Sequence, residues 1–290
     1  EGSGLDRLSA KNIGKVTDHL KNGVVDIEAE NEAEATELAK KILSYFQGSA
    51  DVFECTDQEN LKAILPDDRR YSYEIRDIIK TIADVDSFIE LKKDCGKSLL
   101  TGFIRIEGKP FGLLASDCKF LGGAIDSESA DKAADFFDLC NANNLPMVSL
   151  VDTPGFMVGP ASEKEGAPRK MAKLFRSSSM FKNNLTAIFL RKGYGLGAQA
   201  VVGGSLHKPT YCCSWPSGEF GGMGLEGAVK LGYKKELDAV SDPEEREKLY
   251  NKLVDAMYEA GQAIEAAAFL EIDAVIDPSK TRETILKSQI

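Results

Sequence analysis

The sequence predicts an α/β fold built around a parallel β-sheet. Three short apolar segments with strand character, near residues 146–151, 186–190 and 210–215, each run into a glycine-rich loop and then into a helical pattern. Successive strand–loop–helix units place their strands in parallel and their loops at one edge of the sheet, where such folds bind ligands. We therefore expect the functional site at these three loops.

The first hundred residues predict shorter elements. Residues 24–27 (VVDI) have strand character, and Asn31 followed by Glu34 predicts the capped start of a helix. Residues 48–72 are polar and loop-like. One more helix is predicted because four isoleucines share one face: Ile75, Ile78, Ile79 and Ile82.

The remaining elements are predicted from turn and cap signals. Residues 99–107 and 111–116 form a candidate hairpin around Gly108. Either Asp126 or Ser127 caps a helix that reaches about residue 141. Asp242-Pro243 opens a long amphipathic helix to about residue 267, and a short strand follows at 271–277.

Composition sets limits on the class of protein. A chain of 290 residues can bury a sizeable core in one or two domains. The net charge of −10 argues against a nucleic-acid partner, which would require clustered cations. No apolar run approaches the roughly 20 residues that span a bilayer, and the chain begins with polar EGSG. We expect a cytoplasmic protein, or one of the mitochondrial matrix in a eukaryote.

Cysteine and histidine usage narrows the chemistry. The six cysteines include no C-x-x-C pair, and neighbouring Cys212 and Cys213 should point to opposite faces of a strand. We interpret the cysteines as core thiols in a reducing compartment. With only His19 and His207, a histidine-built metal site is not expected, and no G-x-S-x-G elbow supports a serine hydrolase.

The loop after the strand predicted near residues 186–190 is the most informative segment of the chain. An apolar strand ends at Arg191 and Lys192, and glycine then occupies positions 193, 195 and 197, with a small-residue helix beginning near Gly197. Backbone amides at such a junction lack helical partners, and glycine lets a ligand oxygen approach them.

Three interpretations of this loop compete. The pattern fits a loose dinucleotide fingerprint, but no acidic residue closes a second strand about 20 residues later. A purely structural turn is the second interpretation. An oxyanion hole for a carbonyl or ureido oxygen is the third.

Four segments together decide among them: 121–127 (LGGAIDS), 150–159 (LVDTPGFMVG), 190–200 (LRKGYGLGAQA) and 215–229 (WPSGEFGGMGLEGAV). They resemble, in the same order, the C-terminal half of the carboxyltransferase of biotin-dependent acyl-CoA carboxylases. The resemblance runs from about Leu8 to the end of the chain and is nearest to the single-chain, multidomain type.

The resemblance implies a crotonase-like fold, a spiral of β-β-α units. It also implies carboxyl transfer from carboxybiotin on a carrier domain to the α-carbon of an acyl-CoA. Residues 1–72 would be the tail of the preceding N-terminal half plus a linker, and 73–290 the biotin-side domain. The implied partners are the N-terminal half, biotin carboxylase and biotin-carrier domains in a homo-oligomer, and the chain alone would be inactive.

Site residues follow from the same resemblance. Gly197 and Ala198 correspond to the amide donors for the ureido oxygen, although the additional Leu196 leaves this register open by one residue. The other residues expected to line the biotin pocket are Gly155, Phe156, Gly195 and Ala200. Ala200 stands where propionyl-CoA carboxylases have an acidic residue, so their short-chain preference is not implied.

Several neighbouring residues have two interpretations. Glu165 and Arg169 resemble a pair at the mouth of the site, and a structural salt bridge or a helix-start charge is the alternative. Lys192 could neutralise a carboxylate or simply be solvated. We interpret Trp215 as core and His207 as a surface or packing residue.

Other functions remain open at this point. A carboxyltransferase of a biotin-dependent decarboxylase or transcarboxylase would share these motifs. A non-catalytic module that docks the biotin carrier is an alternative from another class. A dinucleotide enzyme is the least favoured, and the acyl chain length does not follow from the sequence.

Overall fold

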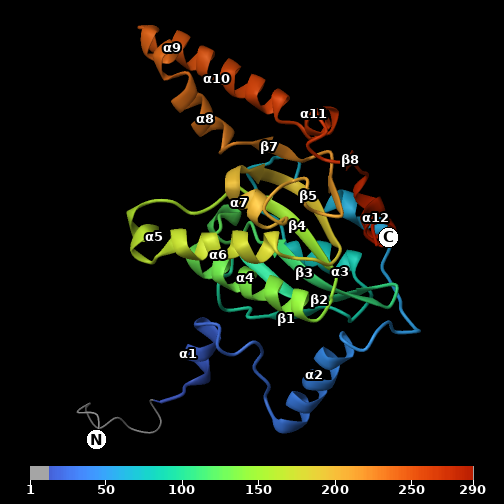
Figure 1. Cartoon of the computed structure of the whole chain (residues 1–290). Helices are drawn as coiled ribbons and strands as arrows, with labels where there is room; N and C mark the ends of the chain where they lie inside the picture. Colours follow the sequence, from blue (N-terminus) through green and yellow to red (C-terminus); the bar gives the residue numbers. More distant parts are fainter. Residues whose placement is uncertain (1–12, 290) are drawn as a thin grey trace, which may run out of the picture.

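The computed structural model describes residues 13–289, and its centre is one mixed β-sheet (Figure 1). Within those residues the sheet has eight strands: seven run in the order β1-β2-β3-β4-β5-β6-β8, and the eighth, β7, pairs with the end of β5. The strands are Ile89–Leu91 (β1), Leu99–Ile106 (β2), Lys109–Ser116 (β3), Met147–Thr153 (β4), Leu185–Tyr194 (β5), Tyr211–Ser214 (β6), Glu219–Gly221 (β7) and Ala274–Val275 (β8).

Helices surround this sheet. The α-helices are Val16–Lys21 (α1), Glu32–Ser44 (α2), Ile75–Ile82 (α3), Ser127–Ala142 (α4), Pro160–Lys164 (α5), Ala167–Ser179 (α6), Gly195–Ala200 (α7), Leu225–Gly232 (α8), Lys234–Ala239 (α9), Pro243–Ala260 (α10), Ala263–Ala268 (α11) and Thr281–Lys287 (α12). Short 3-10 turns occupy Gln58–Ala63 (η2), Leu121–Gly123 (η3) and Pro278–Lys280 (η4).

The sheet divides into an antiparallel edge and a parallel body. β1, β2 and β3 are antiparallel, whereas β3, β4, β5, β6 and β8 run parallel. The predicted hairpin turns at Glu107 and Gly108, which have φ of 50° and 73°. Positive φ at both turn residues matches the twist of the flanking strands. Because β3, β4, β5, β6 and β8 run parallel, their carboxyl ends lie at one edge of the sheet. This confirms the predicted α/β arrangement.

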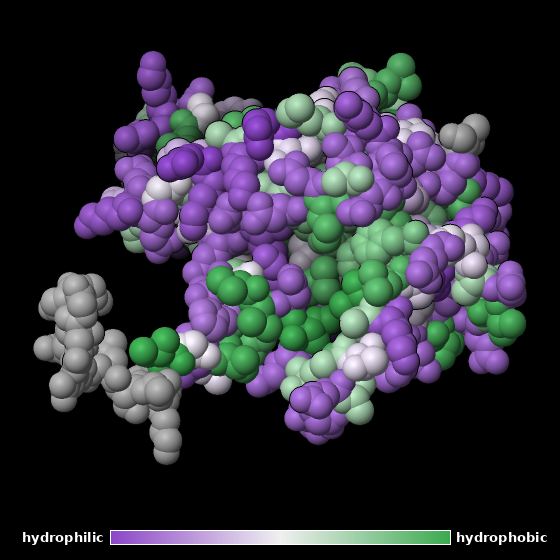
Figure 2. Space-filling view, turned by 60° about the horizontal axis from the view of Figure 1, so that its bottom comes forward, coloured by the Kyte–Doolittle hydropathy of each residue, from purple (hydrophilic) through white to green (hydrophobic). Residues whose placement is uncertain are grey.

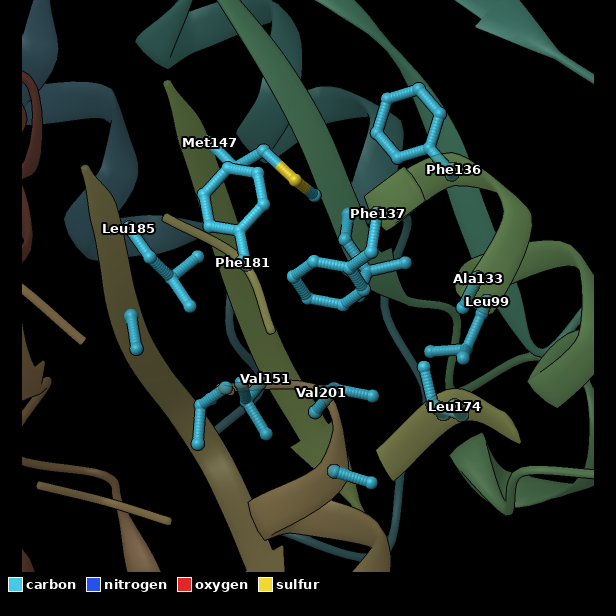
Figure 3. Close-up of a cluster of buried hydrophobic side chains, with 14 of the residues drawn as sticks. Leu99, Ala133, Phe136, Phe137, Met147, Val151, Leu174, Phe181, Leu185 and Val201 are labelled. Atoms are coloured by element: carbon cyan, nitrogen blue, oxygen red, sulfur yellow. The ribbon is translucent and has the colours of Figure 1, made fainter. Parts of the chain in front are cut away.

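The two faces of the sheet hold two separate hydrophobic cores. α4 and α6 cover one face, where Phe103 and Phe189 are buried. Phe137 and Val151 belong to the same core (Figure 3). α3 and α12 cover the other face, with Ile104, Leu150 and Trp215. Cys212 and Cys213 fall in different cores, as the strand alternation predicts.

Two cap signals and one apolar stripe correctly predicted three helices. The Asp126 carboxylate accepts the Ser129 amide at 2.7 Å and starts α4, and the Asn31 side chain accepts the Glu34 amide at 3.0 Å to start α2. The four isoleucines of α3 are buried. These elements were predictable because a cap or an apolar stripe acts within a few residues.

Two predicted elements were wrong. Residues 24–27 form no strand, because the Val24 and Val25 amides both turn back to the His19 carbonyl, and a single backbone bond, from the Lys92 amide to the Asp26 carbonyl, ties the segment to the end of β1. The expected single helix over 242–267 breaks between α10 and α11. There the Gly261 carbonyl accepts the Phe220 amide at 2.7 Å, so the chain leaves the helix to contact β7.

The segment before residue 72 packs against the sheet. Tyr45 and Leu61 are buried in the two cores, so the segment before residue 72 contacts the same sheet. α8, α9 and α10 form an arm above the sheet (Figure 1) with a small core of Val229, Leu237 and Val254.

Cys55 is exposed, which corrects the interpretation of all six cysteines as core thiols. No helix in residues 13–289 has the length and apolar character required to cross a membrane.

The core around Phe137 should dominate stability. Phe137 is fully buried and contacts Phe181 at a ring distance of 5.6 Å (Figure 3). Phe137→Ala is expected to lower the free energy of unfolding by about 3–5 kcal/mol because it leaves a cavity. Leu139→Ala, at a 40% exposed position of the same helix, should change it by less than about 1 kcal/mol. Equal losses in urea unfolding would contradict this account of the core.

Candidate active site

Four glycine-containing loops meet at the carboxyl ends of the parallel strands, as predicted for three of them. A Cβ atom on Gly197 would lie 2.7 Å from the backbone of Gly155 and Phe156. A Cβ on Gly195 would lie 2.8 Å from the Gly222 carbonyl oxygen, and one on Gly123 would lie 2.4 Å from that of Asp152. The loops therefore touch through their main chains, which only glycine permits.

Backbone conformation also requires glycine here. Gly155 has φ of 108° and Gly195 has φ of 63°, both in the region that other residues rarely adopt. The Thr153 hydroxyl accepts the Gly155 amide at 3.1 Å and donates to the Gly123 carbonyl at 2.7 Å. The loop after β4 is thus fixed on both sides.

The first turn of α7 contains Gly197, one of the two residues predicted as amide donors. α7 begins at Gly195, so the amides of Gly195, Leu196 and Gly197 have no acceptor within the helix. The Ala198 amide is the first that can donate to a carbonyl within it, that of Tyr194. The additional Leu196 left open by one residue which amides of this loop would face a ligand. The helix geometry favours Leu196 and Gly197 over Ala198 as candidate donors.

Phe156 supplies a further amide beside this turn. Its neighbours are bound, since Ile125 donates to the Gly155 carbonyl at 2.9 Å and Met157 donates to the Ile125 carbonyl at 2.8 Å. Across residues 13–289, no carbonyl or side chain accepts a hydrogen bond from the Phe156 amide. This amide is therefore available to donate to a ligand oxygen.

An apolar cavity of about 380 Å³ opens beside the loop. It begins at Gly193 and Gly195 and continues along Ala198, Phe220, Ala266 and Phe269. Gln199 also lines it. Ala200 does not: its side chain is completely buried in the core, so its expected place in a binding pocket is not supported by the geometry.

Polar side chains around the strand ends are paired with one another. The Tyr194 hydroxyl donates to Glu219 at 2.7 Å, and burial followed by the Glu219 carboxylate raises the pKa of Tyr194. Lys192 neutralises a carboxylate, but this belongs to buried Asp152, at 3.2 Å. The Asp152 connection escaped sequence reasoning, although opposite charges at two neighbouring strand ends could have indicated it.

The remaining predicted residues lie further from the glycine contacts. Glu165 accepts a hydrogen bond from the Ser127 hydroxyl at 3.0 Å, and Arg169 is exposed on α6. No ion pair joins them in the described chain, which corrects the salt-bridge alternative. Trp215 is fully buried and His207 is exposed, as predicted. Within residues 13–289 no cluster of metal-ligating side chains occurs.

The fold and the loops define the class: a crotonase-like α/β protein whose backbone amides converge at one edge of the sheet. Residues 4–290 match the carboxyl transferase domain family, and the chain belongs to it.

Curated relatives agree with this family. The chain is 32% identical to the methylmalonyl-CoA carboxyltransferase 12S subunit of Propionibacterium freudenreichii, covering 96% of this chain and 54% of the relative. It is also 32% identical to the biotin-dependent acetyl-/propionyl-coenzyme A carboxylase beta6 subunit of Mycobacterium tuberculosis, covering 95% and 59%. The chain thus spans somewhat more than half the length of these relatives.

Solved structures extend the comparison. A single-chain, multi-domain long-chain acyl-CoA carboxylase superposes with a TM-score of 0.91 at 45% identity, covering 99% of this chain and 28% of that one. The transcarboxylase 12S structure, described as a hexamer assembly with methylmalonyl-coenzyme A bound, gives 0.87 at 30% identity, with coverages of 98% and 56%. These similarities confirm the expected crotonase-like fold.

The contact at Gly197 leads to a prediction. Gly197→Ala keeps helical φ, yet its methyl group would overlap the Gly155 and Phe156 backbones, so the loops must separate. We expect the free energy of unfolding to fall by about 1–3 kcal/mol. Gly222→Ala, where open space surrounds the new methyl group, is the control and should change stability by less than about 1 kcal/mol. Equal unfolding curves for both variants would show that the loops are not in contact.

Proposed function

We propose that this chain is the biotin-side part of a carboxyltransferase, which moves a carboxyl group between biotin and the α-carbon of an acyl-CoA. The observation that carries the proposal is the main-chain contact of Gly197 with Gly155 and Phe156. This contact brings the first turn of α7 next to the unpaired Phe156 amide. Family membership supports the reaction class.

The residues present fit a small ring that carries a carbonyl oxygen. Phe156 offers an amide without an acceptor among the described residues, and Leu196 and Gly197 offer amides without a helical acceptor. Glycine keeps side chains out of the space between them. Biotin supplies a covalent carrier for the carboxyl group, and its ureido oxygen is the acceptor that such amides would bind.

The chain's own contribution is binding and electrostatic stabilisation. Backbone amides that are fixed by a sheet stabilise developing negative charge without reorganising, and each is worth about 3–4 kcal/mol of transition-state stabilisation. We assign this role to Phe156, Leu196 and Gly197. Gly155 and Gly195 have the positive φ that orients the two loops. We assign no donor role to Ala198, whose amide has a helical acceptor, and no pocket role to Ala200, whose side chain lies in the core.

The apolar cavity beside α7 is proposed to receive the acyl part of the substrate. It starts at the glycine loop and its walls include Ala198, Leu206, Phe220 and Phe269. Burial of each methylene group in such a cavity is worth about 0.8 kcal/mol. The long-chain acyl-CoA carboxylase with 45% identity supports a substrate with an extended acyl chain.

The proposal includes partners outside this chain. Because the chain spans 54% to 59% of these relatives, we propose that an N-terminal half supplies the thioester side and that the chain alone is inactive. Residues 1–72 would then join the two halves. A homo-oligomer, a biotin-carrier domain and a cytoplasmic or mitochondrial-matrix location belong to the same proposal. A broad apolar band on the lower side of the molecule supports self-association (Figure 2).

A transcarboxylase or decarboxylase would use the same amides, and the 12S relative keeps that alternative open. A non-catalytic module for docking the carrier would not need them. Loss of carboxyl transfer with retained carrier binding, after removal of one amide, therefore separates catalysis from docking.

Leu196→Pro removes one of the proposed donors at the second position of α7, where a helix tolerates proline better than in its interior. Leu196→Ala removes the side chain but keeps the amide. In the complete enzyme, the proline variant should have a kcat about 100-fold below that of the alanine variant, measured as carboxyl transfer to biotin. Equal kcat values in two folded variants would exclude this amide as a donor.

Ala266→Phe tests the cavity. The larger ring would occupy space beside Phe269. We expect kcat/KM to fall at least about tenfold for a long-chain acyl-CoA and much less for acetyl-CoA, because the short chain does not need the cavity. A uniform fall for both substrates would place the acyl chain elsewhere.

A further inference from the structure

The pairing between β4 and β5 is interrupted just before the glycine loops. Val151 pairs with Phe189, but the next pair joins Thr153 to Gly193. Residues 190–192 of β5 therefore lie opposite Asp152 alone. Such an irregularity leaves ladder groups without partners and re-aims the strand that follows.

The Asp152 carboxylate occupies this interruption. One oxygen accepts the Lys192 backbone amide at 3.1 Å and contacts the Lys192 ammonium at 3.2 Å. The other oxygen accepts Nε of Arg191 at 3.2 Å and lies 3.0 Å from Nη2 of the same guanidinium. The Asp152 side chain has no exposed surface, so these groups replace water completely.

The same network reaches a third segment of the chain. Nη1 of Arg191 donates to the Tyr71 carbonyl at 2.8 Å. The guanidinium also lies 5.1 Å from the centre of the Tyr73 ring. Burial, followed by the Asp152 carboxylate, raises the pKa of Tyr73, so this phenol stays neutral. Asp152 and Arg191 thus connect β4, β5 and the segment before α3.

Both glycine loops begin directly after this network. Thr153 follows Asp152 and holds the Gly155 amide, while Gly193 follows Lys192 and leads into α7. The offset of β5 relative to β4 decides which residue of α7 faces Gly155. A different offset would carry Gly197 away from the position where its backbone meets Gly155 and Phe156.

We propose that Asp152 is a positioning residue: its carboxylate fixes the offset of β4 and β5 and so holds the Phe156 and Gly197 amides in one site. This inference rests on the proposed carboxyl transfer. Asp152 itself does not contact the reacting atoms and acts through the two loops. A misplacement of about 1 Å at a reacting centre can reduce a rate about 100-fold.

A second buried ion pair provides a matched control. Asp84 and Arg282 are joined between the end of α3 and α12, where Asp84 also accepts the Glu107 and Gly108 amides at 3.0 Å and 2.8 Å. Both aspartates are almost fully buried and both hold backbone amides. Asp84 lies at the hairpin of β2 and β3, not at the glycine loops.

The test compares Asp152→Asn with Asp84→Asn in the complete enzyme. Both should lower the melting temperature, because each leaves a buried guanidinium without its carboxylate. Asp152→Asn should reduce kcat for carboxyl transfer to biotin by about 10- to 100-fold, with KM for acyl-CoA within about threefold. Asp84→Asn should retain kcat within about threefold. Hydrogen exchange at residues 153–157 should accelerate only in Asp152→Asn.

Equal kcat values and equal exchange for the two variants would overturn the positioning role while the proposed function stands. Absence of carboxyl transfer in the wild-type enzyme would instead overturn the proposed function. If Asp152→Asn does not fold, Arg191→Lys replaces it, since lysine cannot reach both Asp152 and the Tyr71 carbonyl. Its kcat should fall about tenfold relative to Arg282→Lys, and equal values would again overturn the proposal.

Discussion

The close approach of two backbones, at Gly197 and Gly155, is the constraint on which the rest of the site depends. A single methyl group at Gly197 would lie 2.7 Å from the main chain of the loop after β4. The positive φ of Gly155 and Gly195, the Thr153 hydrogen bonds and the interrupted pairing of β4 and β5 all serve this contact. Glycine is required here because of space and conformation together.

A site made of main chain has chemical consequences. Amide donors do not titrate, so their charge distribution does not change with pH, and their positions are set by the sheet. The side chains around the site are paired with one another: Tyr194 with Glu219, and Lys192 and Arg191 with Asp152. These pairs shape and hold the loops, and in the proposed site the amides of Phe156 and α7 bind the substrate.

Local signals made much of this fold predictable from the sequence. The parallel strands, the hairpin at Gly108 and the capped helices α2 and α4 depend on residues a few positions apart. The sequence predictions failed where contacts between segments decide the backbone: the Gly261 carbonyl accepts the Phe220 amide of β7 and the helix ends there, and the Val24 amide turns back to the His19 carbonyl instead of extending into a strand. Likewise, a glycine motif indicated the amides of α7, but the role of Asp152 required knowing how two strands pair.

The most direct measurement is a crystal structure of the complete enzyme with biotin bound. We expect the ureido oxygen to lie within about 2.7–3.1 Å of the amide nitrogens of Phe156 and Gly197 or Leu196. The Gly197–Gly155 contact should be unchanged on binding. Biotin bound elsewhere, with these amides donating only to water, would contradict the assignment of this glycine contact as the oxyanion site.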